Sequence, residues 1–567
     1  MVTIHQQVTD ATMPDESRAS RPHGVVSTLI GVRRFQMVCV AAFAAAFVPY
    51  GWVLWDLWSG TVNPLRINGA DNNPIYDVQA RALLHGHFWL PPGHIGAEAF
   101  VVNGHEFTYF GIFPSLLRMP IFFVTSSLDG RLFAPSILAS WVVTAVFCSL
   151  LLWRVRIFLR GNASLPWVEA VSYGVLLFSI LAGSMLVFLA SRPDVYNEDQ
   201  AWSVALACAS LFALVGVIEK PSSRRIILCG AFVLLTNLNR STTGYAAIVA
   251  MFMLAGWFAL GRAGQVRKSR AITLGAAALP ALVIGCAIDY AKFHVLFGAP
   301  FSDQLVYQYF NEQSINGGHF LSLHWLPSTL QAYLDPTRIH LQSYFPYLAP
   351  GGGLVSAFTG DPTIAVELTM PLLCVLSLWG VVTAFWPKRS VRYRSLRILI
   401  VSAALTVAAV MIYGSIFERY TGDFLPLLIF AGMIGLIDVW RRTRLAPGYV
   451  RNGIPVAALL LALLGFWVNM SYAVSPQVNW SMAQARHYVS DERALGKVIG
   501  QPVVRTASPS GILTSAAPAG ALVVWGNCKA LSVDTAGLPK GAAVGLATVL
   551  IEQAPHTPIC RALLGKR

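Results

Sequence analysis

Two aspartates at the start of the stretch from Asp71 to Pro120 have the chemistry to move a proton. Asp71 lies just ahead of a pattern that predicts an amphipathic helix, because apolar residues recur at helical spacing up to Leu84. An aspartate in that place serves either as a helix N-cap or, if it faces solvent, as a general base. Asp77 falls within the same expected helix and carries the same group.

The rest of this stretch predicts a second short helix. Gly86, Pro91, Pro92 and Gly93 interrupt the chain after the first one. Residues 110–124 are apolar but too few to span a bilayer comfortably, and they predict an interfacial helix that lies in the membrane surface. An acid held beside two such helices, at the depth of lipid headgroups, suits chemistry on a lipid-linked substrate.

Basic side chains in the expected external loops are candidates to hold a phosphate, for which arginine is suited by its two-pronged hydrogen bonding. The candidates are Arg131, Arg192, Arg240, Lys292 and Arg419. The alternative for each is a side chain at a helix end that snorkels to the membrane surface. We select Arg240 and Arg419 as the leading pair.

Two adjacent acids, Glu198 and Asp199, lie in the loop SRPDVYNEDQ at 191–200. They could bind a divalent ion, orient an acceptor, or simply solvate a turn. The sequence leaves these three possibilities open.

Histidines and aromatic residues are frequent in the same external loops. Four histidines follow the first expected helix: His85, His87, His94 and His105. None of them has a zinc-site spacing that further ligands support, so we interpret them as interfacial or sugar-binding groups. Four aromatic residues could stack on a sugar or anchor the chain at the interface: Trp89, Tyr109, Trp325 and Tyr344.

Composition indicates what must position these residues. The chain has 567 residues, of which 55% are hydrophobic and only 12% charged, which is typical of a polytopic membrane protein. We expect an all-α fold with eleven spans. They fall at 36–58, 131–153, 168–190, 201–219, 225–238, 244–261, 272–293, 364–386, 396–416, 424–440 and 452–473. The segments 59–130 and 294–363 are then the large external loops.

The net charge of +14 does not indicate a nucleic-acid partner, because of where the cations lie. More than half of the 41 Lys and Arg residues fall in the N-terminal tail and five short connections, at 154–167, 218–225, 262–270, 387–397 and 440–452. This is the positive-inside pattern. It predicts a cytoplasmic N-terminus and an external C-terminus.

The two ends of the chain differ from the membrane domain at 35–473. Residues 1–34 are polar without an apolar core, which predicts a disordered cytoplasmic tail rather than a signal peptide. Residues 474–567 contain alternating apolar runs and predict a small external domain that is rich in β-strands. Cys528 and Cys560 lie there and could form a disulfide.

Several of these residues occur in the same order as in a known family of proteins. Asp71, Tyr76, Ala80, Leu83, Gly86 and Pro91 match an acid, a tyrosine and a run A-x-x-L-x-x-G-x-x-x-x-P. Tyr109, Phe110 and Pro114 follow, and Asp129–Gly130–Arg131–Leu132 is then similar to a Gly-x-x-Arg-Leu entry into the next span. Over roughly 60–150 the chain therefore resembles the GT-C-type integral-membrane glycosyltransferases that use polyprenyl-phosphate sugars, such as the aminoarabinose and protein O-mannosyltransferases. The segment RYTGDFLP at 419–426 is similar to their RY-x-x-D-x-x-P element.

The resemblance implies transfer of a sugar from a polyprenyl-phosphate donor to a hydroxyl of a glycan, lipid or protein, on the external face of a bacterial inner or plasma membrane. It implies Asp71 as general base. The family often has two adjacent acids where this chain has Asp71–Asn72–Asn73, so Asp77 is a credible substitute. Tyr76, Arg131, Glu198, Arg240 and Arg419 are then candidates for substrate contact. The sequence offers one candidate base and no nucleophile–base pair, which favours inverting displacement. No cofactor is indicated, and a divalent metal remains open.

Other classes of function make different predictions. A transporter or flippase of a lipid-linked glycan predicts inverted hydropathy repeats and ionisable residues at mid-membrane. We find no repeat, and Asp289 lies near the end of its expected span. A non-catalytic membrane scaffold, whose C-terminal domain binds a glycan or a partner, is the remaining alternative.

Overall fold

A computed structural model gives the fold of most of the chain. It describes residues 21–55, 74–261, 268–305, 320–341, 346–350, 358–359, 363–387, 390–474, 494, 504–508 and 511–515. Asp71, Tyr344, Cys528 and Cys560 lie outside the described residues, so the structure does not test their expected functions or the expected disulfide.

The described part of the chain has eight helices that are long and apolar enough to cross a membrane. They are α1 (Arg21–Leu54), α4 (Phe133–Arg160), α7 (Val195–Glu219), α9 (Ser241–Ala259), α11 (Ala271–Phe293), α16 (Val391–Met411), α17 (Leu425–Arg442) with the short helical turns at both its ends, and α18 (Gly448–Val474). The chain is therefore a polytopic membrane protein, as its composition predicts.

Three of the eleven expected spans coincide with shorter helices. The segment 168–190 is divided between α5 (Trp167–Leu181) and α6 (Leu186–Ser191), and 225–238 lies within α8 (Ser223–Asn239). The segment 364–386 is divided between α14 (Val366–Thr369) and α15 (Pro371–Phe385). A helix needs about 20 residues to cross the hydrocarbon core, so length and composition support eight spans and do not confirm eleven.

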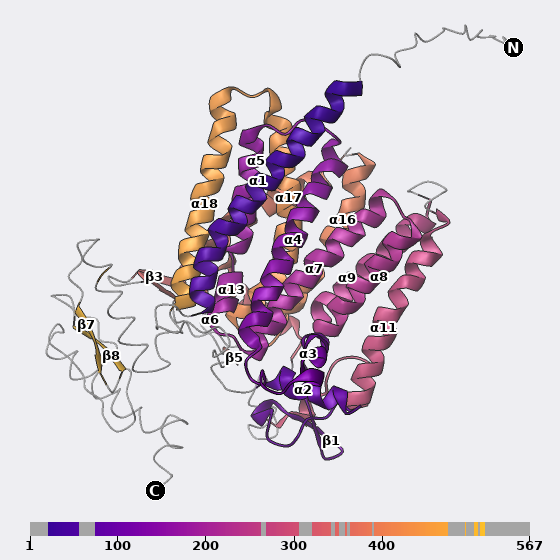
Figure 1. The fold of residues 1–567 in the computed structure, drawn as a ribbon, viewed down its shortest axis with the longest axis vertical. Coiled ribbons are helices and arrows are strands. Elements are labelled where there is room, and N and C mark those ends of the chain that lie inside the picture. The colour runs from indigo at the N-terminus through magenta and orange to yellow at the C-terminus, as the bar shows by residue number, and fades with distance from the viewer. Residues whose placement is uncertain are drawn as a thin grey trace.

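Helix α7 is the centre of the bundle (Figure 1). Its apolar window is 94% buried, whereas that of α11 is only 22% buried. In a membrane protein, a helix that is apolar on all sides can be enclosed by other helices, as α7 is, or can face lipid. Helices α15 and α17 approach each other closely, because a Cβ atom at Gly380 would lie 1.8 Å from the carbonyl oxygen of Ala431. Only glycine fits there.

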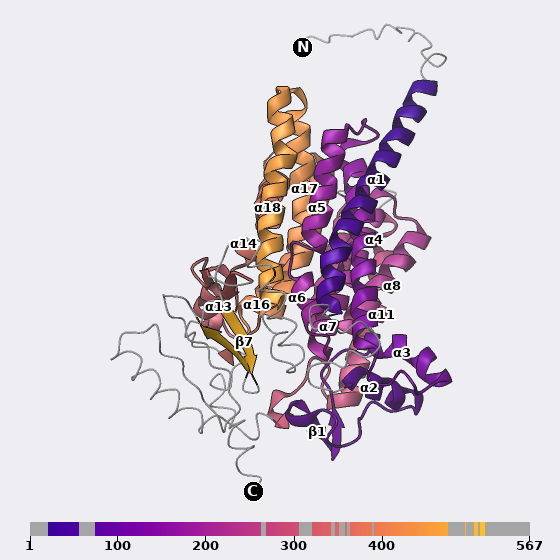
Figure 2. The same cartoon turned by 60° about the vertical axis from the view of Figure 1, so that its left-hand side comes forward.

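The two ends of the bundle differ in the segments that they carry (Figures 1 and 2). The N-terminal end of α1 and the short α4–α5, α7–α8 and α17–α18 connections lie at one end, which we call the basic end. The opposite end, which we call the loop end, holds α2 (Ile75–Leu84), α3 (Phe113–Val124) and the residues that join them. Both expected helices of this first loop are thus confirmed.

Helix α3 has the two faces that an interfacial helix needs. Phe113, Phe122 and Arg118 are buried against the protein, whereas Phe123 and Val124 are each 82% exposed. Exposed apolar side chains at the end of a membrane bundle are favourable where they meet lipid.

Short strands complete the loop end. β1 (Phe100–Val102) and β2 (His105–Phe107) form an antiparallel hairpin in which Phe100 pairs with Phe107. Asn103 and Gly104, with φ of 52° and 80°, make its tight turn. The short helical turn η2 (Gly96–Glu98) precedes β1, and η3 (Phe301–Asp303) follows α11.

Later segments add η6 (Leu323–Trp325) and α13 (Leu326–Leu334). β3 (Ile339–Leu341) pairs antiparallel with β4 (Leu348–Pro350), and β5 (Phe358–Thr359) pairs parallel with β6 (Ser415–Ile416). Beyond residue 474, β7 (Val504–Ser508) and β8 (Gly511–Ser515) form an antiparallel hairpin. Beyond residue 474, the structure describes only this hairpin and Ala494. A β-rich C-terminal domain therefore remains a prediction.

Candidate functional site

Arg118 joins α2, α3 and α7 at the loop end. Its Nε donates to Oδ1 of Asp77 at 2.6 Å, and its two terminal nitrogens donate to the two carboxylate oxygens of Glu198, each at 2.7 Å. The three side chains, which we call the Arg118 cluster, are at most 3% exposed. A bidentate arginine–carboxylate pair of this kind fixes orientation as well as distance.

Asp77 is fully occupied within this cluster. Its second oxygen, Oδ2, accepts a hydrogen bond of 2.6 Å from the backbone N–H of Gly130. Burial raises the pKa of the Asp77 carboxyl above its ordinary value, although Arg118 and the Gly130 N–H act in the opposite direction. This geometry suits a residue that locks α2 to α3, because both of its oxygens are bonded to other parts of the protein.

Arg118 remains a cation under all physiological conditions. Burial lowers the pKa of its guanidinium, but the charges of Glu198 and Asp77 outweigh burial and bring the pKa above its ordinary value. The cluster therefore holds one positive charge between two carboxylates.

Glu198 belongs to the first turn of α7. The helix begins after Asp194, whose side chain caps it by accepting from the backbone N–H of Asn197 at 2.9 Å. Glu198 also accepts from the hydroxyl of Ser136, to which the indole N–H of Trp202 donates at 2.9 Å. Glu198 is 0% exposed and Asp199 2%, so the interpretation that these acids solvate a turn is wrong.

A second arginine, Arg240, connects the next acid of α7 to a distant part of the chain. Arg240 lies between α8 and α9 and donates to Oδ2 of Asp199 at 2.7 Å. It also donates to both oxygens of Asp423, at 2.9 and 3.2 Å. We call these three residues the Arg240 cluster. The Arg240 side chain is 19% exposed, whereas Asp199 and Asp423 are 3% and 0% exposed.

Tyr76 connects the first loop to this second cluster. Its ring is 0% exposed, and its hydroxyl donates to Oδ1 of Asp199 at 3.3 Å. Asp423 lies in the helical turn η7 (Glu418–Phe424), and Gln200 donates to it at 3.3 Å. A chain of contacts thus runs from Tyr76 through Asp199 and Arg240 to Asp423, across more than 340 residues of sequence.

The first loop is fixed against the bundle by two further features. At Gly111 a Cβ atom would lie 2.0 Å from the carbonyl oxygen of Asn239, so only glycine allows this approach to the end of α8. Lys292, at the end of α11, is 2% exposed and donates to the carbonyl oxygens of Thr108 and Phe110, both at 3.0 Å. In this structure Lys292 therefore binds the backbone of the loop, which differs from the phosphate contact for which it is a candidate.

Arg419 lies over aromatic rings at the same end. Its guanidinium carbon is 3.9 Å from the ring centre of Phe417, 4.4 Å from that of Tyr196 and 5.5 Å from that of Tyr420. The side chain is partly exposed, and this arrangement is typical of cation–π packing at a surface.

An aromatic row continues from Tyr196 into the first loop. Tyr196 meets the ring of Phe110 edge to face at 5.3 Å, and Phe110 stacks on Tyr109 at 4.3 Å. Tyr109 is 38% exposed, and its hydroxyl donates to Glu98 at 3.4 Å. Because aromatic faces stack on sugar rings, this row can contact a glycan beside Arg419.

Other candidates lie outside these contacts. Arg131 is exposed, and Arg192 is 3.4 Å from Asp194. Trp325 is only 5% exposed and packs in the core, so it does not line a surface groove. His87, Trp89 and His105 form a stack at the surface, with ring centres 4.1 and 4.7 Å apart.

The described residues contain no group of three or more His, Cys, Asp or Glu side chains placed to hold a metal ion. Glu198 and Asp199 each have an arginine partner instead. A metal site at these two acids would require both arginines to move away.

Sequence reasoning missed Arg118. A signal was present, because this arginine lies in the middle of an apolar segment where an unpaired charge would be costly. Such a residue predicts a buried carboxylate partner, although the sequence does not say which carboxylate it is.

Comparison with known proteins gives a distant structural likeness. No family model matches the sequence, and no curated protein matches it. A solved structure that matches is the archaeal oligosaccharyltransferase AglB from Archaeoglobus fulgidus, in complex with an inhibitory peptide and a dolichol-phosphate. The two chains are 15% identical with a TM-score of 0.45, over 85% of this chain and 61% of that chain. This chain thus matches less than two thirds of the length of that protein.

Proposed function

We propose that this protein is an integral-membrane glycosyltransferase that moves a sugar from a polyprenyl-phosphate donor to an acceptor hydroxyl at the loop end of the bundle. The observation that carries the proposal is the convergence of the two sequence elements that resemble the GT-C family. Tyr76 belongs to the first element and Asp423 to the second, and Asp199 and Arg240 join them through hydrogen bonds of 2.7 to 3.3 Å.

The placement of charge favours an enzyme over a transporter. Within the eight described spans, Asp, Glu, Lys and Arg lie near the helix ends and not at mid-helix. A transporter of a charged, lipid-linked substrate needs polar groups at mid-membrane to line its path. The loop end instead combines a partly exposed arginine, aromatic rings and an interfacial helix, which is what a substrate with a lipid tail and a sugar phosphate requires.

In the proposed reaction, a carboxylate takes the proton of the acceptor hydroxyl. At the same time, the oxygen of that hydroxyl attacks the anomeric carbon of the donor sugar. The bond from that carbon to the phosphate oxygen breaks, and the polyprenyl phosphate leaves with the electron pair. Attack from the face opposite the phosphate inverts the anomeric configuration.

We assign the general base to Asp71, which precedes α2 in the sequence and lies outside the described residues. Asp77 is less suited to this function because both of its oxygens are bound and the residue is only 2% exposed.

We assign some of the remaining candidates to contact with the substrate and the others to positioning of neighbouring side chains. Arg419 is the group that we assign to the donor phosphate, and Arg131, exposed at the same end, is a second candidate for it. Arg240, Tyr76 and Glu198 are positioning residues in this proposal, since their polar atoms are bonded to neighbouring side chains.

The test compares two aspartates six residues apart. Asp71→Asn removes the base and is expected to lower transfer about 10²–10⁴-fold with the amount of folded protein unchanged. Asp77→Asn is expected to reduce the amount of folded protein while the molecules that fold retain activity. Asn72→Ala is the matched control next to Asp71. The measurement is transfer of a radiolabelled sugar from a polyprenyl-phosphate donor by the purified chain in lipid vesicles.

Two results would contradict the proposal. A fully active Asp71→Asn variant would exclude Asp71 as the base. Movement of the labelled donor across the vesicle membrane without any product would identify a transporter instead.

A further inference from the structure

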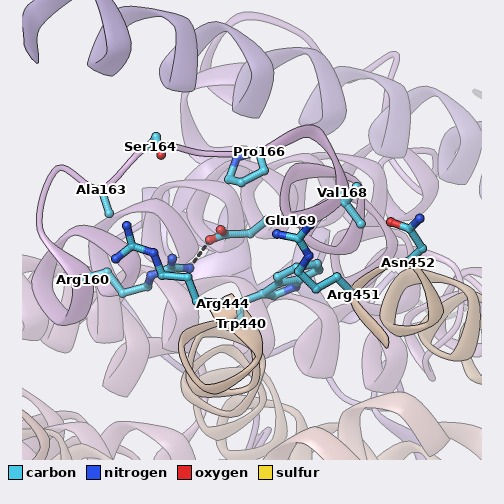
Figure 3. Close-up of a pocket in the computed structure, with 10 residues that line it drawn as sticks. All are labelled: Arg160, Ala163, Ser164, Pro166, Val168, Glu169, Trp440, Arg444, Arg451 and Asn452. Atoms are coloured by element: carbon cyan, nitrogen blue, oxygen red, sulfur yellow. Dashed lines mark hydrogen bonds and ion pairs between the residues drawn. The ribbon is translucent and has the colours of Figure 1, made fainter. Parts of the chain in front are cut away.

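The basic end of the bundle contains a pocket that glycosyl transfer at the opposite end does not use (Figure 3). Its volume is about 150 Å³, many times that of a single water site. It lies between the α4–α5 connection, the end of α17 and the start of α18. Its lining residues are Arg160, Ala163, Ser164, Pro166, Val168, Glu169, Trp440, Arg444, Arg451 and Asn452.

The charge around this pocket is strongly positive. Glu169 is its single acidic lining residue, and it is already bonded to Arg160 (Figure 3), Arg156 and the hydroxyl of Tyr173. Two of those groups are arginines, so the charge of Glu169 is more than balanced before the rest of the pocket is considered.

Arg444 and Arg451 add two further positive charges. Both are exposed, and the structure gives their guanidinium groups no carboxylate partner among the described residues. Arg451 lies in the first turn of α18, which has no acidic residue, so the partial positive charge of the helix end adds to that of the side chain. The pocket is therefore suited to an anion.

An independent observation comes from Trp440. This residue lines the pocket and is 4% exposed, and its indole N–H has no hydrogen-bond acceptor among the described residues. Buried donors are nearly always satisfied in native structures, so an orphaned donor in the wall of a positive pocket indicates a missing acceptor. A phosphate oxygen is an acceptor that would satisfy the indole and the arginines together.

Apolar side chains that are close in sequence to the lining residues are exposed. Leu445 is 95% exposed, Tyr449 79% and Trp167 47%. Trp and Tyr side chains are typical of the membrane–water interface, and a soluble ligand would not need this apolar rim.

We propose that this pocket binds the phosphate group of an anionic phospholipid headgroup from the leaflet at the basic end. Arg444 and Arg451 hold the phosphate oxygens, the Trp440 N–H donates to one of them, and the apolar rim meets the acyl chains. Such a site would anchor the α17–α18 connection to α5. It is independent of the proposed function, because it lies at the opposite end of the bundle from Asp199 and Arg240.

The experiment measures lipid retention on the purified full chain by native mass spectrometry. The probes are phosphatidylglycerol, phosphatidylcholine and inorganic phosphate. We expect the wild-type chain to retain phosphatidylglycerol about tenfold more strongly than phosphatidylcholine, and R444Q/R451Q to lose this preference. W440F, which keeps the ring size and loses the N–H, should weaken retention about threefold, as expected for one hydrogen bond.

A matched control removes the same charge from the same end. Arg224 and Arg394 are exposed there and do not line the pocket, so R224Q/R394Q should retain the preference. Equal loss in both double variants, or unchanged retention in R444Q/R451Q, would overturn the proposal. Binding of inorganic phosphate without a preference between the two lipids would also overturn it, since the ligand would then be a soluble phosphate.

Discussion

The Arg118 cluster and the Arg240 cluster have the same composition and different access to solvent. Each joins one arginine to two carboxylates, and Glu198 and Asp199 are consecutive residues of α7. Consecutive residues of a helix point about 100° apart, so each acid meets a different arginine. The Arg118 side chain is 2% exposed and that of Arg240 is 19% exposed. The comparison separates a cluster that is closed to solvent from one that solvent partly reaches.

The two clusters also differ in the residues that they contact. The Arg118 cluster is linked to backbone at Gly130 and to the side chain of Ser136 in the wall of the bundle. The Arg240 cluster is linked to Tyr76 and lies close to Tyr420, whose ring centre is 5.7 Å from the Arg240 guanidinium carbon. Because Arg419 also lies over Tyr420, the second cluster is continuous with the partly exposed surface.

The largest effect is expected at Arg118. Arg118→Ala would leave Asp77 and Glu198 buried without their cation, which should cost about 3–5 kcal/mol of folding free energy. Thermal unfolding of the purified chain in detergent measures this loss. The control is Arg81→Ala, because Arg81 and Asp129 form an ion pair whose side chains are 35% and 40% exposed. That variant should lose less than about 1 kcal/mol. Equal stability of the two variants would show that burial does not determine how much these ion pairs contribute to the free energy of folding.

A smaller loss of stability is expected at Arg240, together with a loss of activity. Arg240→Ala should cost about 2 kcal/mol, since the side chain is partly exposed and water can screen the two carboxylates that remain. Transfer of labelled sugar should fall by more than the loss of folded protein explains, because Asp199 and Asp423 lose their fixed positions. Arg240→Lys keeps the charge without the forked geometry, so it should recover stability more fully than activity. Proportional recovery of both would contradict a positioning function.

The smallest effect on stability is expected at Arg419. Arg419→Gln removes a cation that packs over three aromatic rings, which should cost about 1 kcal/mol or less of folding free energy. If Arg419 holds the donor phosphate, the KM for the polyprenyl-phosphate sugar should rise about tenfold, as expected from loss of a charge-assisted contact. Steady-state transfer at varied donor concentration measures it. An unchanged KM would remove Arg419 from the donor site and leave Arg131 as the candidate.

Much of the architecture was predictable because the signals are local. Apolar length predicted the eight helices that the structure supports, and helical spacing between 75 and 84 predicted α2. The short apolar segment around Pro114 predicted α3 as an interfacial helix, which its exposed Phe123 and Val124 agree with. These predictions depend on neighbouring residues alone, so a single sequence contains them.

The candidate site was predictable only as a set of residue types. Tyr76, Asp77, Glu198, Arg240 and Arg419 all lie at the loop end, but their pairing was not evident from the sequence. Asp77 and Arg118 are 41 residues apart, and Arg240 and Asp423 are 183 apart. The spacing of residues along the chain does not say which of these distant residues come together in the fold.

The amino-acid sequence by itself determined that this chain enters a membrane, where its helices lie and which connections carry its positive charge. Those properties follow from the transfer of apolar residues out of water and from the cost of burying charge in lipid. Only the tertiary structure decided that Asp77 is bound on both oxygens and that Tyr76 contacts Asp199. It also decided that Arg240 lies between two acids. A buried charge requires a partner, but the packing of the helices decides which partner comes within hydrogen-bonding distance.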